Sequence, residues 1–143
     1  MAATRTGLAE GWAGRQIVSG FVFDANIVID ALLGIEKGRA ELRRAVNQTG
    51  RAWLSRMTWI EVMSKSYGAE LREMERFLAG FAIDEIDSQI AERAAALRRE
   101  RSSLCATDAI VLATAFVRGR VLVTRNTGDF PAEMPGIRIP YTL

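Results

Sequence analysis

A short apolar run that ends abruptly on an acid, Phe21-Val22-Phe23 followed by Asp24, constrains the fold more than any other stretch of the chain. The run is brief, aromatic and β-branched and has no polar alternation, which predicts a strand buried on both faces. A second apolar run, residues 27–33, follows at once and predicts a buried helix that ends at Gly34. Asp24 would then lie at the carboxyl end of a buried strand, where open α/β sheets have their ligand crevices.

Strand-like and helix-like patterns alternate along the rest of the chain, which predicts an α/β fold with a mainly parallel sheet covered by helices. For 143 residues we expect one domain over 20–143, preceded by a loosely ordered extension, 1–19, with Trp12 as its only large anchor. The predicted strands are 21–24, 52–55, 81–86, 121–124 and 137–139. The predicted helices are 27–33, 35–48, 69–80, and three that open near Thr58, Ser88 and Thr107.

Polar residues ahead of the last three helices predict how those helices are capped. Thr58 and Glu61 have the spacing of a capping box. Asp87 and Thr107 are the expected N-caps of the two helices that follow.

Charged residues on the first two helices predict faces that are exposed to water. Asp30 is expected to point outward from the first helix. Glu41 is expected on the solvent face of the helix over 35–48, and residues 47–50 are expected to form a turn.

The composition excludes several kinds of catalysis. Histidine is absent and Cys105 is the only cysteine, which excludes Ser-His-Asp and Cys-His catalysis, histidine-bound zinc and an intrachain disulfide. The net charge of +2 says little about partners, and nearly all basic residues are arginines, which suit phosphate and surface carboxylates alike. The remaining carboxylates, hydroxyls, amides and arginines favour a site for a hard metal ion.

The apolar stretches also bear on location. None approaches the ~18 consecutive apolar residues that a membrane span needs, and the first twenty residues lack the apolar core of a signal peptide. Together with the single cysteine, this fits a protein of the reducing cytoplasm that has no membrane partner.

Four acids share a context at the ends of predicted elements. Asp24 follows the first buried strand, Glu61 lies in the first turn of a helix, Asp108 lies in the first turn of the central helix, and Asp129 lies just past the strand over 121–124. In a right-handed α/β layout the carboxyl ends of strands and the amino ends of helices meet along one edge. We therefore expect these four side chains to converge.

Converging carboxylates repel one another, and no lysine or histidine lies in these motifs to neutralise them. An oxygen-coordinated Mg²⁺ or Mn²⁺ would resolve the repulsion. Such an ion lowers the pKa of bound water and stabilises a phosphoryl transition state. The sequence thus favours hydrolysis of a phosphodiester.

Each acid also has a structural explanation that the sequence leaves open. Glu61 needs no role beyond a capping box, Asp108 suits the positive end of a helix, and Asp129 follows turn-forming residues. Asp24 is the hardest to explain structurally, because a carboxylate at the end of a buried strand is costly unless it is paired or lies in a cleft. Cys105 is read as a packing residue and not as a nucleophile, since no base is visible near it.

Four short motifs carry the acids: Val22-Phe23-Asp24-Ala25-Asn26, Thr58-Trp59-Ile60-Glu61, Thr107-Asp108-Ala109-Ile110 and Leu122-Val123-Thr124-Arg125-Asn126-Thr127-Gly128-Asp129-Phe130. In this order and at these spacings, they resemble PIN-domain nucleases. Within that family they are most similar to the VapC-type ribonuclease toxins of toxin–antitoxin pairs. The last motif is the most distinctive.

The resemblance implies a three-layer α/β/α domain with Mg²⁺-dependent endoribonuclease activity, with Mn²⁺ as an alternative ion. It implies that Asp24 and Asp108 ligate the metal directly, that Glu61 helps to orient water, and that Asp129 ligates a second metal or positions its waters. Polar support would come from three further residues, Asn26, Thr58 and Thr124.

The resemblance also implies partners. It implies a homodimer, a small antitoxin that inserts a segment into the active-site groove, and an RNA substrate cut in single-stranded loops of transfer or ribosomal RNA. The chain departs from many relatives at Ala106-Thr107, where Leu-Pro is common, and at Ala25, where a hydroxyl residue is common.

Two rival functions stay open. A PIN-like fold without catalysis would bind RNA or protein, although such a module has no need for four repelling acids. A phosphatase with Asp24 as nucleophile would want a second aspartate two residues on, where this chain has Asn26.

Overall fold

The computed structural model describes residues 20–131 and 133–143. The predicted extension over 1–19, with Trp12, lies outside the described residues, so its loose order stays a prediction.

The centre of the molecule is a five-stranded sheet in which every pairing is parallel, as predicted. The strand order is β3-β2-β1-β4-β5, with β1 in the middle. Val22 of β1 lies beside Trp53 on one neighbour and Leu122 on the other. The strands are β1 (Phe21–Phe23), β2 (Trp53–Ser55), β3 (Ala82–Asp84), β4 (Val121–Val123) and β5 (Ile137–Arg138).

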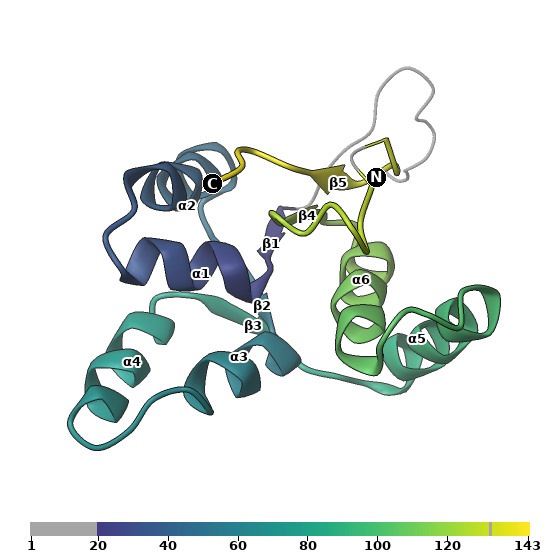
Figure 1. Cartoon of the computed structure of the whole chain (residues 1–143), viewed down its shortest axis with the longest axis horizontal. Coiled ribbons are helices and arrows are strands. Elements are labelled where there is room, and N and C mark those ends of the chain that lie inside the picture. Colours follow the sequence, from purple (N-terminus) through teal and green to yellow (C-terminus); the bar gives the residue numbers. More distant parts are fainter. Residues whose placement is uncertain (1–19, 132) are drawn as a thin grey trace.

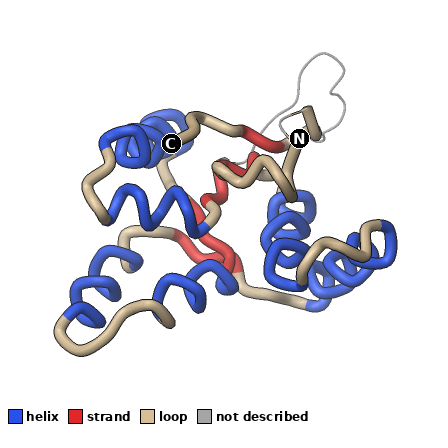
Figure 2. Tube along the Cα trace, in the orientation of Figure 1, coloured by secondary structure: helices blue, strands red, loops and turns tan. Residues whose placement is uncertain are grey.

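Helices cover both faces of this sheet, which gives the expected three-layer α/β/α arrangement (Figures 1 and 2). The helices α1 to α4 pack on the face that carries Phe21, Phe23 and Leu54, whereas α5 and α6 pack on the face that carries Val22 and Leu122. The helices are α1 (Ala25–Leu32), α2 (Glu36–Thr49), α3 (Arg56–Met63), α4 (Glu70–Leu78), α5 (Ser88–Glu100) and α6 (Ala106–Arg118).

The first strand is buried on both faces, as its apolar run predicted. Val22 and Phe23 are fully inaccessible to solvent, as are Leu54 and Leu122 on the neighbouring strands. Each of these side chains contributes about 1.5–3 kcal/mol by leaving water. The core therefore fixes β1 at the centre of the sheet, and Asp24 at its carboxyl end.

Two helices begin earlier than the sequence predicted. Ser55, and not Thr58, caps α3, because its Oγ accepts a hydrogen bond from the Met57 amide. Cys105, and not Thr107, caps α6, and its exposed Sγ accepts from the Asp108 amide at 3.5 Å. The prediction of Cys105 as a packing residue is therefore wrong.

Other helix boundaries follow the sequence more closely. Asp87 caps α5, with its Oδ1 accepting from the Ile90 amide at 2.9 Å. α2 runs through the expected turn to Thr49 and ends at Gly50, whose φ of 85° is the left-handed conformation that glycine tolerates.

The prediction that Glu41 faces water, made from its place on a charged helix, is wrong. Glu41 is 9% exposed, and both of its carboxylate oxygens accept hydrogen bonds from Arg138 of β5 at 2.9 Å. The misreading arose because the partner lies 97 residues away along the chain. The pair ties α2 to the edge strand of the sheet.

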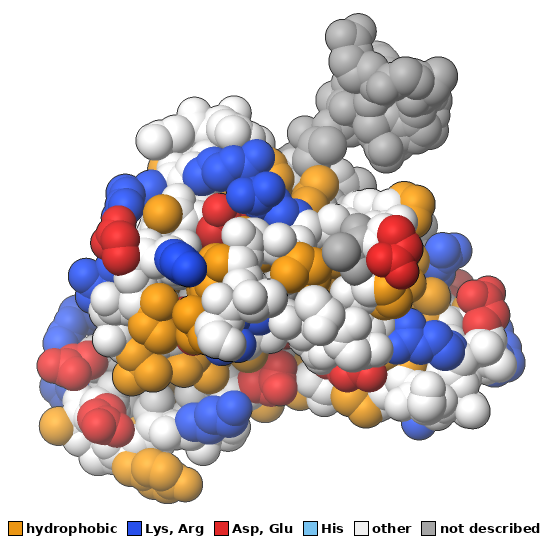
Figure 3. All heavy atoms as spheres, turned by 45° about the horizontal axis from the view of Figure 1, so that its top comes forward, with side chains coloured by type: hydrophobic (Ala, Val, Ile, Leu, Met, Phe, Trp, Pro, Cys, Tyr) orange, Lys and Arg blue, Asp and Glu red, His pale blue; other side chains and the backbone are white. Residues whose placement is uncertain are grey.

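The surface is mixed in character. Figure 3 shows basic (blue) and acidic (red) side chains interspersed on the face it draws, with a larger group of hydrophobic side chains (orange) in its left half. Within the described residues, no helix is long and apolar enough to cross a membrane.

Candidate active site

Asp24 lies at the junction of β1 and α1 and is only 6% exposed. Its Oδ1 accepts a hydrogen bond from the Ala25 amide at 2.9 Å, so the carboxylate caps α1. Its Oδ2 accepts from Thr124 Oγ1 at 2.8 Å and from Asn26 Nδ2 at 3.3 Å. The carboxylate is thus held firmly, but by neutral groups only.

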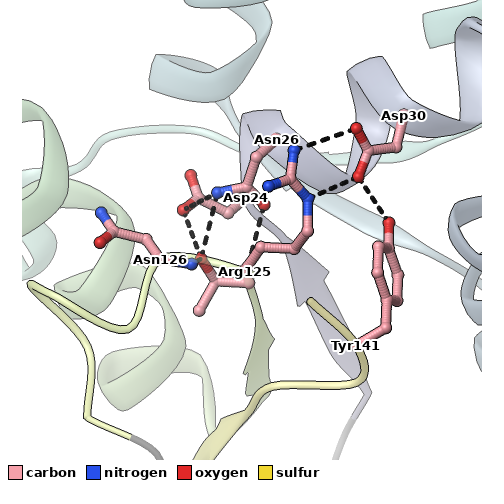
Figure 4. A network of polar contacts seen from close by, with 7 residues as sticks. Asp24, Asn26, Asp30, Arg125, Asn126 and Tyr141 are labelled. Atoms are coloured by element: carbon pink, nitrogen blue, oxygen red, sulfur yellow. Dashed lines mark hydrogen bonds and ion pairs between the residues drawn. The ribbon is translucent and has the colours of Figure 1, made fainter. Parts of the chain in front are cut away.

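Thr124 and Asn26 join the ends of β1 and β4 into one polar network (Figure 4). Thr124 Oγ1 also accepts from the Asn126 amide at 3.0 Å. The Asn26 Oδ1 atom accepts from the Arg125 amide at 3.1 Å. Both residues therefore contact the first acid and also fix the loop that follows β4, as expected of supporting polar residues.

Asp129, in the loop that follows β4, shares a hydrogen bond with Asp108. Asp108 lies in the first turn of α6, near the positive end of the helix. Burial raises the pKa of Asp108 to about 6, with further upward contributions from a hydrogen bond with Asp129 and from the charges of Asp24 and Asp129. The pKa of Asp129 is lowered, mainly by a hydrogen bond from Asn126 and then by the bond with Asp108. The hydrogen bond that the two acids share thus shifts their pKa values in opposite directions.

Glu61 lies in the second turn of α3 and not in the first, because the helix begins one turn earlier than predicted. Its explanation as a capping-box residue is therefore removed. Burial raises the pKa of Glu61, and the charge of Asp24 raises it further, while Lys65 lowers it. Thr58 is fully buried, and its Oγ1 has no hydrogen-bond partner among the described residues. Its supporting role stays a prediction.

Three of the four acids open onto one pocket of about 320 Å³ at the carboxyl edge of the sheet. Asp129 does not line the pocket but reaches it through its bond with Asp108. The lining residues are Asp24, Ala25, Asn26, Ile29, Asp30, Glu61, Lys65, Asp108, Arg125 and Asn126. The structure thus brings together all four acids predicted from the sequence.

The pocket carries an excess of negative charge close to buried groups. Burial raises the pKa of Asp24, more than its hydrogen bonds from Thr124, Ala25 and Asn26 lower it. In the described part of the chain, no cation forms an ion pair with Asp24, Glu61 or Asp108. An arrangement of this kind stabilises a cationic ligand.

The donor set fits a hard divalent cation. Within residues 20–131 and 133–143, no three acidic or thiol side chains are close enough to enclose a metal ion together. Mg²⁺ is usually held by one or two carboxylates while it keeps several waters, and so needs no such cage. Asp24 and Asp108 are the two carboxylates that the sequence predicted for this role, and their assignment stays a prediction.

Two residues of the pocket wall, Asp30 and Arg125, and one residue behind it, Tyr141, were missed or misplaced from the sequence. Asp30 does not point outward as predicted: it is 3% exposed and forms a two-point ion pair with Arg125. Tyr141, near the end of the chain, donates to the same carboxylate at 2.7 Å. Arg125 lies within the most distinctive motif, and this position is the one sequence signal that pointed to it.

Comparison with known proteins identifies the fold. A family model described as the PIN domain matches residues 21–132. No curated protein gave a significant match.

Among solved structures, the chain is similar to a chain from a toxin–antitoxin complex of Klebsiella pneumoniae, with 37% identity and a TM-score of 0.73, covering 85% of this chain and 98% of that one. It is also similar to a chain of DNA-bound VapBC from Salmonella typhimurium, with 26% identity and a TM-score of 0.69, covering 86% and 97%. A likeness to FitAcB from Neisseria gonorrhoeae has 21% identity, a TM-score of 0.69 and coverages of 86% and 99%, and it supports the fold alone.

Proposed function

This chain belongs to the PIN-domain family, and from that premise we propose that it is a Mg²⁺-dependent endoribonuclease that serves as the toxin of a toxin–antitoxin pair. The single observation that carries the proposal is the convergence of Asp24, Glu61, Asp108 and Asp129 at one edge of the sheet without a neutralising ion pair on the first three. A non-catalytic binding module would have no use for that repulsion.

Asp24 and Asp108 would hold the cation, and Mn²⁺ has the same ligand preference as Mg²⁺. When bound, the ion would neutralise charge on a phosphodiester and lower the pKa of its water. Asp129 would ligate a second ion or position its waters. Glu61, whose pKa is raised, would orient the attacking water and accept its proton.

The neutral residues of the site have a positioning role. Thr124 and Asn26 hold Asp24 Oδ2 in place, so the carboxylate need not reorganise when a ligand arrives. Because Thr124 and Asn26 are themselves uncharged, they leave the negative charge of Asp24 available. We expect an RNA strand to enter with its bases splayed, as in the single-stranded loops of transfer or ribosomal RNA.

The antitoxin would cover the pocket and its surroundings. An apolar pocket of about 380 Å³ between α1, α3 and α4 shares Ile29 and Lys65 with the acidic pocket. Its rim includes Leu33, which is 71% exposed. A short apolar segment of a small antitoxin, followed by a basic side chain, would fit this continuous surface. Homodimerisation and a cytoplasmic location belong to the same proposal.

Cleavage of RNA in Mg²⁺ tests the enzyme. Asp24→Asn and Asp108→Asn should each lower the cleavage rate by about 100-fold or more, because each removes a charge on which metal binding depends. Glu92→Gln, which neutralises an exposed acid on α5, is the matched control and should leave the rate unchanged. EDTA should abolish cleavage by the wild type. Equal cleavage by all four proteins would refute the proposed site.

Growth of cells tests the biological role. Expression of the wild type should arrest growth, and co-expression of the small protein from the neighbouring reading frame should relieve the arrest. Arrest by Asp108→Asn as strong as that by the wild type would contradict a toxic nuclease activity.

A further inference from the structure

Asp30 anchors a built cluster in the wall of the acidic pocket. Its carboxylate accepts from Arg125 Nε at 2.6 Å and Nη2 at 3.1 Å, a two-point pairing that fixes the plane of the guanidinium. Tyr141 Oη donates to the same carboxylate at 2.7 Å. The side chain of Asp30 is 5% exposed, whereas that of Arg125 is 28% exposed. The guanidinium of Arg125 is thus bound by a buried carboxylate on one side and is accessible to solvent on the other.

Gly38 of α2 packs closely against α1 and leaves space for this cluster. A Cβ on Gly38 would come within 3.0 Å of Asp30 Cβ and 3.1 Å of Tyr141 Oη. Glycine therefore lets the tyrosine reach the carboxylate. Since Asn26 binds the Arg125 amide, the arginine is fixed at its backbone as well as at its guanidinium.

The remaining edge of the guanidinium faces the candidate active site. Figure 4 shows the third nitrogen of Arg125, Nη1, turned toward Asn26 and Asp24 and away from Asp30. Arg125 and Lys65 are the two cations among the described residues that line this pocket. A phosphate that approaches the acids would otherwise meet net repulsion.

We propose that Arg125, held by Asp30 and Tyr141, binds a backbone phosphate of the RNA beside the acidic pocket. The inference rests on the proposed function and adds to it a substrate-binding residue with two positioning residues. A preoriented guanidinium loses little freedom on binding, so it favours one placement of the strand over the acids. The competing explanation is that Arg125 only neutralises Asp30 and has no contact with RNA.

Binding of a short fluorescein-labelled single-stranded RNA to the full chain, followed by anisotropy, separates these explanations. The Asp108→Asn protein in Mg²⁺ buffer is the parent, and a gel of the same samples shows whether the RNA is intact. Adding Arg125→Ala should weaken binding about ten-fold and lower the slope of log K against log salt by about 0.7, the loss of one phosphate contact on a single strand. Adding Arg72→Ala, which removes an exposed arginine on α4, should change neither quantity.

A charge-balanced variant guards against misfolding. Asp30→Asn combined with Arg125→Gln removes one negative and one positive charge, so the net charge stays the same while the polar pair is kept. It should weaken RNA binding and reduce the salt slope as Arg125→Ala does. Arg125→Lys should retain the slope, and Tyr141→Phe should weaken binding only about two-fold, through looser positioning.

The outcomes separate two kinds of failure. If the parent binds RNA and the charge-balanced variant binds it with the same affinity and salt slope, Arg125 is a structural residue and this inference is wrong. If the parent binds no RNA at all, the proposed function fails together with the inference.

Discussion

Two groups of buried acids in this fold are treated in opposite ways. Acids of the first group each meet an arginine with both oxygens: Asp30 with Arg125, Glu41 with Arg138, and Asp84 with Arg120. Asp24 is buried to a similar degree, 6% exposed against 3% for Asp30, yet among the described residues its hydrogen bonds come from a hydroxyl, an amide and a backbone N–H. The chain is rich in arginine. The lack of a cation beside Asp24 in the described structure is therefore specific to this position, and does not reflect a low content of basic residues.

The pKa shifts of Asp30 and Asp24 differ in the same way. Burial is the largest influence on the pKa of Asp30 and raises it, but the hydrogen bonds from Arg125 and Tyr141 outweigh it, and the pKa is lowered. At Asp24, burial prevails over the neutral donors, and the pKa is raised. The negative charge of Asp30 is therefore compensated within the fold, whereas that of Asp24 is not compensated by an arginine.

The largest expected contrast is in stability. Asp30→Asn should lower the free energy of unfolding by about 3–5 kcal/mol, because it leaves a partly buried arginine without its counter-charge. Asp24→Asn should change it by no more than about 1 kcal/mol, since asparagine is also a good helix cap. Urea unfolding in EDTA measures both. Equal losses would mean that the two acids do not belong to different groups.

The next effect is stabilisation by metal. Mg²⁺ at about 100 times its Kd should stabilise the wild type by about 2.7 kcal/mol, which corresponds to a rise in Tm of roughly 5–10 °C. Asp24→Asn and Asp108→Asn should lose most of this rise, whereas the exposed control Glu92→Gln should keep it. Differential scanning calorimetry makes the comparison. A Tm rise of the same size in all proteins would show that Mg²⁺ binds elsewhere.

A smaller effect is the pH dependence of the metal-free protein. The pKa of Asp108 is raised to about 6 in the fold from 3.8, so between these values the native state binds more protons than the unfolded state. Stability from this group is therefore fully present below about pH 4 and is lost as the pH rises through about 6. Because Asp108 is partly exposed, solvent screening reduces the loss to about 1 kcal/mol.

Unfolding in EDTA across this pH window measures the effect. Asp108→Asn should flatten the profile, whereas Glu92→Gln should leave it unchanged. The same change in stability between pH 4 and pH 6 in the wild type and in Asp108→Asn would contradict the assignment, because other acids also titrate in this window.

The smallest effect concerns a pair at the surface. Glu85 is paired with Arg56 by two hydrogen bonds, but both groups are in contact with water. Glu85→Gln should leave the urea midpoint unchanged within error, because exposed ion pairs contribute little. A clear loss would show that pairing with arginine, and not burial, sets the contribution of an acid.

The convergence of the four acids was predictable because it follows from topology. Once β1 and β4 are read as parallel strands, Asp24 and the loop to Asp129 must meet at one edge. The position of Asp108 follows for the same reason, since α6 returns the chain to the start of β4. The positions of these residues are described by the structure, whereas their roles remain predictions.

The details that sequence reasoning missed depend on partners that are distant in sequence, or on two neighbouring residues that could each cap the same helix. Asp30 was predicted to face outward because no residue near it in sequence is an obvious ion-pair partner. Its partner, Arg125, lies 95 residues away along the chain. At α3, Thr58 matched the capping-box pattern, but Ser55, the last residue of β2, already caps the helix. The local sequence pattern could not decide between Ser55 and Thr58 as the N-cap of α3. The end of β2 at Ser55 does decide between them.

The pocket is assembled from opposite ends of the chain, and this has a consequence for protein synthesis. Thr124 meets Asp24 across a sequence separation of 100 residues, and Tyr141 meets Asp30 across 111. A nascent chain on the ribosome therefore has its first acid long before it has the groups that position it. The pocket and the cluster behind it are complete only after residue 141 has been synthesised, and products truncated before β4 would lack the pocket.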